Sequence, residues 1–400
     1  MYTKKTVRDI DVAHKRVLLR VDFNCPLYNG IVMDDTRIRE ALPTIQYLIE
    51  HNARIIIASH LGRPSGHGKF ESEFSMMPVA MRLIQLLGKP VSVIGGSQIA
   101  GEDALSASLA LKDGQVMMLE NLRFDDGEKA NDLRFVHRLA SLCDIYVNDA
   151  FGAAHRAHAS ISGVPEFVPA VSGLLLAKEV DTQQSMLHDP ERPFVAILGG
   201  SKVSDKLGII ENLLDVADTI IIGGAMCFTF LAAKGLAVGT SKMEPDMVGE
   251  ARKIMETAEA RGKELLIPVD VVCADVFAEG AKTKTTSAED IPEDMMGLDI
   301  GPETCELYRS AVKGAKTVFW NGPMGVFEMD QFAHGTQAVA EAVAANEGCT
   351  SIIGGGDSVA AVNKFDLADK MSWISTGGGA SMELVEGKAL PGVEALNDAE

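Results

Sequence analysis

Short apolar runs alternate along the first half of the chain with segments in which apolar residues recur every third or fourth position. The runs have the length and composition of buried strands, and they cover residues 16–22, 54–59, 116–119 and 145–148. The segments between them, such as 43–51 and 77–87, have the i, i+3, i+4 spacing of amphipathic helices. Strands that alternate with helices predict a mostly parallel sheet covered by helices.

The second half repeats this pattern, with a glycine turn after many of its strands. Apolar runs end near residues 198, 222, 272, 320, 353 and 375. Glycine pairs or triplets follow several of them, for example Gly199-Gly200 and Gly223-Gly224. This predicts a second doubly wound sheet with its glycine turns along one edge. Residues 279–303, rich in Lys, Thr, Asp and Gly, are interpreted as a surface excursion whose GLDIGP segment either flanks a base or is a plain turn.

A connector separates the halves. Residues 162–192 carry prolines around a helical stretch, 173–187, and prolines at the ends of a helix limit where it bends. The expected fold is therefore α/β, with two Rossmann-like, doubly wound parallel-sheet lobes and a cleft between them. The predicted domains are 1–172 and 188–382, joined by the helix 173–187.

Composition narrows the class of protein. The length of 400 residues and the hydrophobic content of 46% suit a globular chain with a large core, and no apolar leader or membrane-length run is found. We therefore expect a cytoplasmic protein. The net charge of −19 disfavours nucleic acid and membrane surfaces as partners. The six cysteines show no metal-binding spacing and are interpreted as reduced thiols.

Arginine is concentrated in the first half, with thirteen residues before position 201 and three after it. Several of these arginines, with other polar residues, directly follow predicted strands. Carboxyl ends of parallel strands meet at one edge of a sheet, so a crevice for a small, multiply charged anion is expected there. The candidates are Asp22, Asn24, Arg37, His60, Arg63, Arg123 and Arg156. Taken singly, each has a plainer interpretation as a cap, a structural histidine or a solvated charge.

The segment 350–362, TSIIGGGDSVAAV, predicts a strand, a tight turn and a helix. Glycines there allow a phosphate to approach the backbone, the helix start offers N–H donors, and Asp357 can hold Mg²⁺. The alternative is a turn that needs only positive φ, with Asp357 as a helix cap. Lys202 and Lys206 follow another glycine pair and share a helical face if that helix starts early.

Three other function classes fit the sequence less well. A Rossmann-type dehydrogenase would explain two α/β lobes, but no GxGxxG opens a helix after the first strand of either half. A P-loop NTPase is disfavoured because GxxxxGK[ST] is missing. A two-lobed anion-binding protein would explain the arginines but not the lysines and glycine turns of the second half.

Several motifs together resemble the phosphoglycerate kinase family. They are RVDFN at 20–24, SHLGRP at 59–64, ENLRF at 120–124, NDAFGAAHRAHAS at 148–160, GGSKVSDK at 199–206, WNGPMGVFE at 320–328, GGGDS at 354–358 and STGGGAS at 375–381. Small departures lie beside them, since Ala225, Ser201 and Ser204 stand where family members often have glycine or alanine.

The resemblance implies phosphoglycerate on the first lobe, Mg-nucleotide on the second, and a C-terminal segment, about 383–400, that packs back on the first. It places the glycerate site at Asp22, Phe23, Asn24, Arg37, His60, Leu61, Gly62, Arg63, Arg123 and Arg156. It places the nucleotide site at Lys202, Lys206, Gly297, Glu328, Gly354, Gly355, Gly356, Asp357 and Ser358, with Mg²⁺ on Asp357.

The implied reaction is reversible phosphoryl transfer between 1,3-bisphosphoglycerate and MgADP, giving 3-phosphoglycerate and MgATP. The acceptor carboxylate is already ionised at neutral pH, so no general base is required. Catalysis is then expected to rest on positioning and charge neutralisation by Arg37, Lys202 and the helix start at Gly378 and Gly379. In-line transfer requires the lobes to close by hinge bending. The family also favours a monomer.

Overall fold

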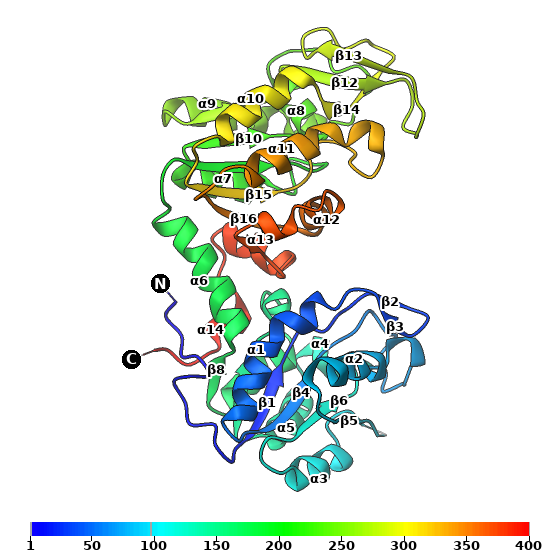
Figure 1. Ribbon diagram of the computed structural model, residues 1–400, viewed down its shortest axis with the longest axis vertical. Helices are drawn as coiled ribbons and strands as arrows, with labels where there is room; N and C mark the ends of the chain where they lie inside the picture. The colour runs from blue at the N-terminus through cyan, green and yellow to red at the C-terminus, as the bar shows by residue number, and fades with distance from the viewer. Residues whose placement is uncertain (1, 97, 400) are drawn as a thin grey trace. The chain divides into compact units, whose positions relative to one another are not determined.

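The chain folds into two compact units, each built around a six-stranded parallel sheet, in the computed structural model, which describes residues 2–96 and 98–399. Unit 1 comprises residues 1–182 and 389–400, and unit 2 comprises residues 183–388. Figure 1 shows both units with their elements labelled. The α/β class and the two parallel sheets expected from the sequence are confirmed.

The sheet of unit 1 has the strand order β5-β6-β4-β1-β7-β8. Its strands are β1 (Arg16–Arg20), β4 (Arg54–Ala58), β5 (Val91–Ile94), β6 (Val116–Leu119), β7 (Ile145–Asn148) and β8 (Ala170–Ser172). A hairpin of β2 (Leu27–Tyr28) and β3 (Ile31–Val32) follows β1. The helices are α1 (Thr36–Glu50), α2 (Met77–Leu87), α3 (Glu102–Ala110), α4 (Gly127–Ala130), α5 (Leu133–Ser141) and, near the C-terminus, α14 (Pro391–Glu394).

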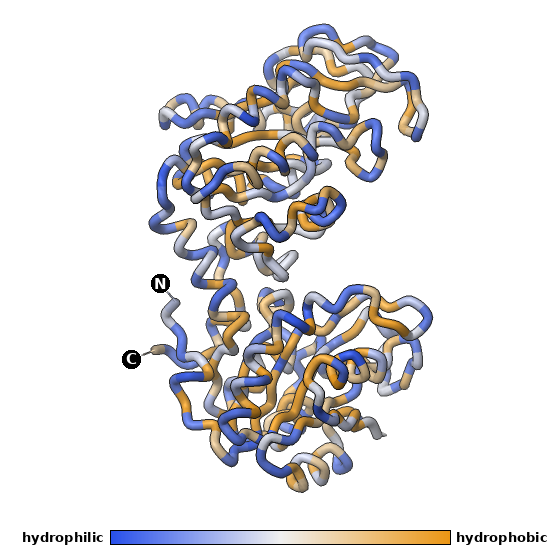
Figure 2. The backbone as a smooth tube through the Cα atoms, in the orientation of Figure 1, coloured by the Kyte–Doolittle hydropathy of each residue, from blue (hydrophilic) through white to orange (hydrophobic). Residues whose placement is uncertain are grey.

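The core of unit 1 follows from the alternation of side chains along its strands. Val17 and Leu19 of β1 point to one face of the sheet, where they pack with Ile38 and Ile45 of α1. In Figure 2 the central strands are orange and the helices carry blue outer turns. The apolar face of each helix therefore covers the sheet, as the helical spacing predicts.

The sheet of unit 2 has the order β11-β10-β9-β15-β16-β17. Its strands are β9 (Phe194–Leu198), β10 (Thr219–Ile222), β11 (Glu264–Leu266), β15 (Thr317–Asn321), β16 (Thr350–Gly354) and β17 (Trp373–Ile374). Helices α7 (Leu207–Val216), α8 (Met226–Ala233) and α9 (Val248–Ala260) contribute to one core, and α10 (Pro302–Val312), α11 (His334–Ala344) and α12 (Gly356–Lys364) to the other. The chain reverses its winding between β9 and β15, which is where doubly wound sheets bind ligands.

A three-stranded antiparallel sheet is added to unit 2 in the order β13-β12-β14. It consists of β12 (Asp270–Ala274), β13 (Thr283–Ser287) and β14 (Met296–Ile300). The prediction of a single strand that ends near residue 272 is therefore wrong. Its first part is β11 of the parallel sheet, and β12 begins a new sheet after Pro268. The predicted surface excursion supplies both partners of β12.

Helix α6 (Leu174–His188) carries the chain from one unit to the other. It begins where Asp149, at the end of β7, accepts hydrogen bonds from the N–H groups of Leu175 (2.9 Å) and Leu176 (3.1 Å). Burial raises the pKa of Asp149 to about 7. A Cβ on Gly173 would lie 2.2 Å from Oδ1 of Asp149, so only glycine fits before this helix.

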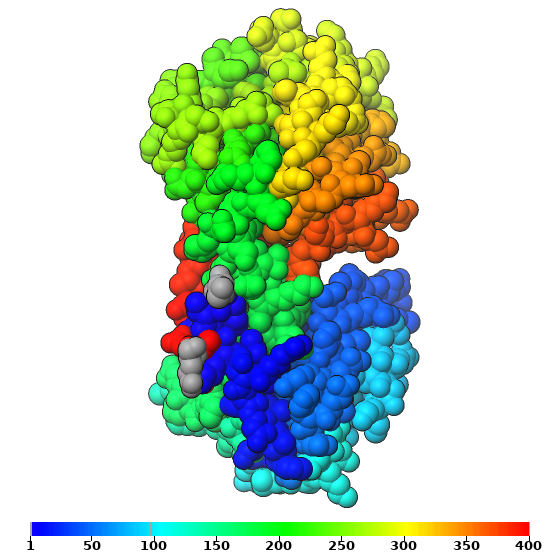
Figure 3. All heavy atoms as spheres, turned by 60° about the vertical axis from the view of Figure 1, so that its left-hand side comes forward, coloured from blue at the N-terminus to red at the C-terminus, as the bar shows by residue number. Residues whose placement is uncertain are grey.

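The C-terminal segment pairs with the N-terminal segment on unit 1. Lys4 forms a β-bridge with Asp398, and the N–H of Ala399 donates to the carbonyl of Thr3 over 2.8 Å. Figure 3 shows this red segment against the blue N-terminal one. The segment that joins unit 1 begins at Ala389 rather than near 383, because Val385, in helix α13 (Gly379–Val385), is buried in the core of unit 2.

In the part of the chain that the structure describes, no helix has the length and apolar character needed to span a membrane.

Candidate functional site

The ends of β1, β4, β6 and β7 deliver a group of cations to unit 1 at the switch point of its sheet, between β1 and β7. Most of the predicted polar residues interact there, through hydrogen bonds, through ion pairs or through longer-range electrostatic effects on each other's pKa. The members that the sequence predicted are Asp22, Asn24, Arg37, His60, Arg123 and Arg156. The convergence expected from the strand ends is therefore present for these residues.

Asp22 lies between a cation and an imidazole. The NH1 group of Arg37 donates to its Oδ2, and Nε2 of His60 lies 4.0 Å from its Oδ1. Burial alone would raise the pKa of Asp22, but its basic surroundings, which include the guanidinium groups of Arg37 and Arg20, outweigh burial and lower the pKa to about 2. Asp22 is therefore a fixed negative charge that orients Arg37, and its pKa excludes it as a base at neutral pH.

Main-chain contacts fix the loops that follow the strands. The Oδ1 atom of Asn24 accepts from the N–H of Gly62 over 2.8 Å, and NH1 of Arg123 donates to the carbonyl of Gly62 over 2.6 Å. Gly62 has a φ of +60°. Burial, followed by repulsion from Arg156 and Arg20, lowers the pKa of Arg123 to about 10. Its buried Nε has no hydrogen-bond partner in the structure.

Arg156 and His158 come from the loop after β7. The Nε atom of Arg156 donates to Nε2 of His155 over 3.2 Å. Burial, followed by repulsion from Arg123, Arg20 and Arg156, lowers the pKa of His158 to about 4. His158 is therefore neutral near pH 7.

The sequence interpretation missed Arg20, the last residue of β1. Its side chain is 1% exposed and donates through Nε to Oγ of Ser160 over 2.7 Å. Its NH2 group is 3.8 Å from the buried carboxylate of Glu128. Arg20 lies within an apolar run, so periodicity assigns it to a strand. The signal that could have identified it is a charged residue inside an apolar run, because a buried charge needs a partner.

The four arginines 20, 37, 123 and 156 face two carboxylates, Asp22 and Glu128, which leaves an excess of two positive charges. Guanidinium groups bind carboxylate and phosphate oxygens through forked donors. The unpartnered Nε of Arg123 adds a buried donor. This group can therefore hold a small anion that carries more than one negative charge.

Three predicted members contribute differently from what was expected. Arg63 is exposed, and no hydrogen bond or ion pair ties its side chain to the group in the described residues. Phe23 and Leu61 are buried in the core of unit 1, so their side chains face away from solvent. Their main chains hold the loops, since the N–H of Phe23 donates to Oγ of Ser59 over 2.9 Å.

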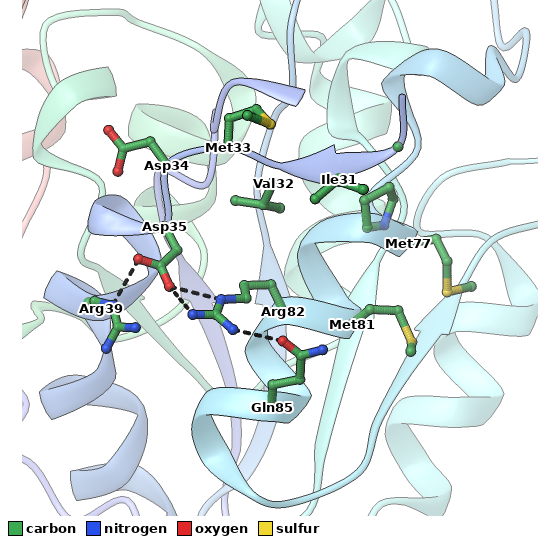
Figure 4. Close-up of a pocket in the computed structure, with 12 residues that line it drawn as sticks. Ile31, Val32, Met33, Asp34, Asp35, Arg39, Met77, Met81, Arg82 and Gln85 are labelled. Carbon is green, nitrogen blue, oxygen red and sulfur yellow. Dashed lines mark hydrogen bonds and ion pairs between the residues drawn. The ribbon is translucent and has the colours of Figure 1, made fainter. Parts of the chain in front are cut away.

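A hollow of about 660 Å³ in unit 1 is lined by none of these residues. It is lined by the β2–β3 hairpin, by the start of α1 and by α2 (Figure 4). The cations in it are already paired, because Arg39 and Arg82 both donate to Asp35. Exposed Ile31, Met33 and methionines of α2 make up much of the remainder. Such a lining does not suit a small anion.

In unit 2, a cavity of about 390 Å³ opens at the switch point between β9 and β15. Glycine turns line much of it. The lining residues are Gly199, Gly200, Ser201, Lys202, Asp205, Lys206, Asn321, Gly322, Gly355, Gly356, Asp357, Ser358, Gly378, Gly379 and Met382. A Cβ on Gly199 would lie 2.1 Å from the carbonyl oxygen of Pro323, so the two turns pack main chain to main chain.

Two side chains leave unused donors in this cavity. The ammonium of Lys206 donates to Oδ1 of Asn321 and lies 3.7 Å from the sulfur of Met382. The buried Nδ2 of Asn321 has no acceptor in the structure. Burial lowers the pKa of Lys206 to about 8 against the attraction of Asp205, Asp357 and Glu386. An unpaired amide and a partly desolvated ammonium suit a phosphate ligand.

Lys202 and Lys206 do not share a helical face, because α7 begins at Leu207, after both of them. Lys202 lines the cavity with an exposed side chain. Asn321 was not predicted as a site residue, although it lies in the motif WNGPMGVFE at 320–328. Its position as the last residue of β15, beside the glycine of the neighbouring strand end, was the available signal.

The turn after β16 has the expected strand, turn and helix geometry. Gly355 has a φ of +85° and precedes α12, and Asp357 lies exposed in the first turn of that helix. The buried hydroxyl of Ser358 accepts from the N–H of Gly322 over 2.6 Å. Ser358 therefore joins this turn to the turn after β15, and Gly354 ends the buried strand.

A second, more apolar pocket of about 510 Å³ shares Gly200, Ser201 and Asp357 with the cavity. Its other lining residues include Phe228, Phe277, Met296, Gly297, Leu298, Val326 and Glu328. A Cβ on Gly297 would lie 2.1 Å from Cζ of Phe228, so glycine at this position leaves room for the ring. The two pockets together have the form expected for a nucleotide, with an apolar part for a base and a polar part for phosphates.

The donor set fits magnesium only together with a ligand. No cluster of three His, Cys, Asp or Glu side chains that could hold a metal is found in the described residues. Asp357, and Asp205 nearby, offer carboxylates beside the glycine turns. Mg²⁺ commonly uses one or two carboxylates with water and substrate phosphates, so the residues present fit an ion that arrives with a nucleotide.

Comparison with known proteins relates the arginine group of unit 1 and the glycine-lined cavity of unit 2 to one family. The family model for phosphoglycerate kinase matches residues 7–388. Curated phosphoglycerate kinases of Rubrobacter xylanophilus and Moorella thermoacetica are 57% and 55% identical to this chain, each over 99% of both sequences.

Solved structures agree with this relationship. The phosphoglycerate kinase of Coxiella burnetii superposes with a TM-score of 0.90 at 42% identity, over 98% of both chains. That of Pyrococcus horikoshii gives a TM-score of 0.82 at 32% identity, over 99% of this chain and 98% of the other. A match of this extent covers both the arginine group of unit 1 and the glycine-lined cavity of unit 2. The chain therefore belongs to the phosphoglycerate kinase family.

Proposed function

We propose that this chain transfers a phosphoryl group reversibly between 1,3-bisphosphoglycerate and MgADP, giving 3-phosphoglycerate and MgATP. Family membership makes it a phosphotransferase of glycolysis. One observation carries the detail: a positively charged group on unit 1 and a glycine-lined cavity next to an apolar pocket on unit 2 occur in the same chain. These are complementary to a phosphorylated acid and to a nucleotide, respectively.

The arginine group binds the phosphoglycerate. Arg123 and Arg156 bind its non-transferring phosphate, supported by the unpartnered Nε of Arg123. Arg63, which no contact holds in the described residues, extends to the same ligand from solvent. Asp22 positions Arg37, and Asn24 positions the loop at Gly62. His60, beside Asp22, also contacts the bound phosphoglycerate.

The cavity of unit 2 binds the phosphates of the nucleotide. Lys206 and Asn321 supply the unused donors described above, and Gly355 and Gly356 line the same space. The base enters the apolar pocket beside Gly297, with Glu328 at its polar margin. Asp357 holds Mg²⁺, which neutralises phosphate charge when it is bound.

Chemistry requires no general base because the acceptor in the ATP-consuming direction is a carboxylate. Charge on the transferring phosphoryl group is neutralised by Arg37 from unit 1 and Lys202 from unit 2, with the N–H groups at Gly378 and Gly379 as further donors. Because the two ligands belong to different units, transfer over about 3 to 3.5 Å requires the units to close around both ligands.

The enzyme acts as a cytoplasmic monomer in this proposal. Six free cysteines suit a reducing compartment. One chain supplies both half-sites, so a partner subunit is not needed to complete them.

A coupled assay tests the proposal. Purified protein is given MgATP and 3-phosphoglycerate, and the 1,3-bisphosphoglycerate formed is reduced by glyceraldehyde-phosphate dehydrogenase with NADH. NADH consumption that requires all three of protein, ATP and phosphoglycerate is expected. Lys202→Ala should lower kcat by about 100-fold or more. Lys234→Ala, an exposed lysine of unit 2 outside both pockets, is the matched control. Turnover without phosphoglycerate, or none at all, would overturn the assignment.

A further inference from the structure

The imidazole of His60 lies between a cation and a carboxylate in the arginine group. Its Nδ1 atom is 3.2 Å from NH2 of Arg20, and its Nε2 atom is 4.0 Å from Oδ1 of Asp22. The residue is 4% exposed. Each ring nitrogen therefore faces one protein group, and the chemistry of those groups decides where the ring proton resides.

Arginine remains protonated in proteins and can only donate hydrogen bonds. An imidazole nitrogen that accepts from it must carry a lone pair, so the ring proton can reside only on Nε2. We infer that Arg20 is a positioning residue that fixes His60 as a neutral imidazole with its proton on Nε2. His60 then meets the phosphoglycerate as a hydrogen-bond donor and not as a cation, an inference that rests on the function proposed above.

A buried network prevents Arg20 from turning away. Its Nε donates to Oγ of Ser160 over 2.7 Å, and its NH1 donates to the carbonyl of Val21. The Ser160 hydroxyl in turn donates to Oε1 of Glu128 over 2.6 Å, while the N–H of Ser160 donates to Oε2 of Glu128 over 3.0 Å. Ser160 and Glu128 are fully buried and Arg20 nearly so. All three nitrogens of the guanidinium are thus engaged, and NH2 stays directed at Nδ1.

Burial and the arginines around His60 also favour its neutral form. Burial lowers the pKa of His60 well below its ordinary value, and Arg20 of β1, Arg123 of the turn after β6 and Arg156 of the loop after β7 lower it further. Asp22 acts in the opposite direction. The net positive charge offered to the substrate therefore comes from arginine, and His60 contributes one N–H on the side of Asp22.

Nitrogen-15 spectroscopy of histidine-labelled protein tests this without any substrate. The His60 signals are assigned from the spectrum of His60→Gln. Between about pH 5.5 and about pH 8, where ordinary histidines titrate, Nδ1 should stay pyridine-like and Nε2 pyrrole-like. An imidazolium, or a proton on Nδ1, in the unmodified protein within this range would overturn the inference.

Two variants test whether Arg20 is responsible. In Arg20→Met the constraint on Nδ1 is lost, so His60 should show imidazolium character toward the acid end of the same range. Arg16→Met is the matched control, since Arg16 lies at the other end of β1 and bonds to Asp144; there the His60 signals should not change. Unaltered His60 signals in folded Arg20→Met would contradict the inference, and if that variant does not fold, the spectrum of the unmodified protein still decides.

Kinetics supply an independent test. The ratio of KM for 3-phosphoglycerate in His60→Leu, which has no donor, to KM in the unmodified enzyme cancels titration of the substrate itself. A neutral donor predicts a ratio of about tenfold that is constant with pH. A ratio that falls toward one as pH rises through the ordinary pKa of histidine would show that His60 binds as a cation. If neither enzyme used 3-phosphoglycerate, the proposed function would fail while the spectra still reported the tautomer.

Discussion

Binding of a nucleotide to unit 2 should take up a proton at Lys206. The ammonium of this residue lies in the glycine-lined cavity with Asn321 and the sulfur of Met382 as its neighbours, and burial lowers its pKa to about 8. A phosphate within a few ångströms favours the charged form and raises a lysine pKa by about 1 to 3 units. The protonation state of Lys206 is therefore linked to the occupancy of the cavity.

The size of this linkage follows from the pKa of about 8. At pH 8 about half of the free protein carries a neutral Lys206, so saturation with nucleotide should take up about 0.5 proton per molecule. Near pH 9 only about a tenth of the free protein is protonated, so the uptake should lie between about 0.4 proton, if the pKa rises by about 1 on binding, and about 0.9 proton, if it rises by about 3. The same linkage weakens nucleotide binding by up to about tenfold for each pH unit above 8.

Calorimetry of MgADP binding in two buffers with different ionisation enthalpies measures the uptake directly. Lys206→Arg should abolish it, since arginine stays charged throughout this range, and should also flatten the dependence of Kd on pH. Lys234→Met, which changes an exposed lysine outside the pockets, should leave the uptake intact. Equal apparent enthalpies in both buffers at pH 8, or uptake that persists in Lys206→Arg, would refute the reasoning.

Three further changes test other parts of the structure. Arg37→Ala should lower kcat by about 100-fold or more in the coupled assay, with little change in the Kd of the nucleotide. The side chain of Arg134 is 89% exposed, so Arg134→Ala should leave kcat unchanged. A raised KM alone would contradict the role given to Arg37. Asp357→Asn should weaken MgADP binding but not 3-phosphoglycerate binding by calorimetry, and equal losses would make Asp357 a structural residue. Asp149 keeps its proton up to about pH 7 in the folded state but only up to about pH 4 in the unfolded state. The urea midpoint of unfolding should therefore fall as pH rises from about 4 to about 7. In Asp149→Asn this fall should be smaller, and an unchanged slope would exclude Asp149 as its source.

Periodicity predicted β1, β4, β6 and β7 of unit 1 and β9, β10, β15, β16 and β17 of unit 2, because each is short, apolar and flanked by glycine or by polar residues. It did not predict β5 and β8, the two edge strands of the unit 1 sheet, and β8 lies in the segment that was interpreted as a connector. The order of the strands could not be obtained in this way, since pairing between distant segments depends on packing that a local pattern does not contain. The region from 264 to 300 shows the limit. A single apolar stretch there contains β11 and β12, which belong to different sheets and are separated at Pro268.

The candidate site was predicted where polar residues directly follow strands, as with Asp22, His60 and Arg123. Arg20 was missed because it lies within a strand, where alternation says only that a side chain points to one face or the other. Asn321 was missed for a related reason, since it ends β15 and belongs to the strand and the turn together. Arg63 shows the converse, because a position directly after a strand does not by itself bring a side chain into a group of contacts.

At three helix starts in the described residues, a buried carboxylate accepts hydrogen bonds from main-chain N–H groups. Asp149 caps α6, Asp270 accepts from the N–H of Thr304 at the start of α10 over 2.7 Å, and Asp299 accepts from the N–H of Gly335 at the start of α11 over 2.8 Å.

In each case a glycine makes room for the carboxylate. Side chains on Gly173, Gly301 and Gly335 would lie 2.2, 2.2 and 2.3 Å from atoms of these aspartates. The helix dipole and the N–H donors stabilise the carboxylate charge, yet burial still raises the pKa of Asp149 and of Asp299 to about 7. Asp299 and its neighbours in β14 also line the apolar pocket of unit 2, so the hydrogen bond from Gly335 to Asp299 fixes one wall of that pocket. The three glycines are therefore required by packing, as is Gly199 against Pro323, whereas Gly355 is required by the positive φ of the turn before α12; only the contacts of the folded chain distinguish the two kinds.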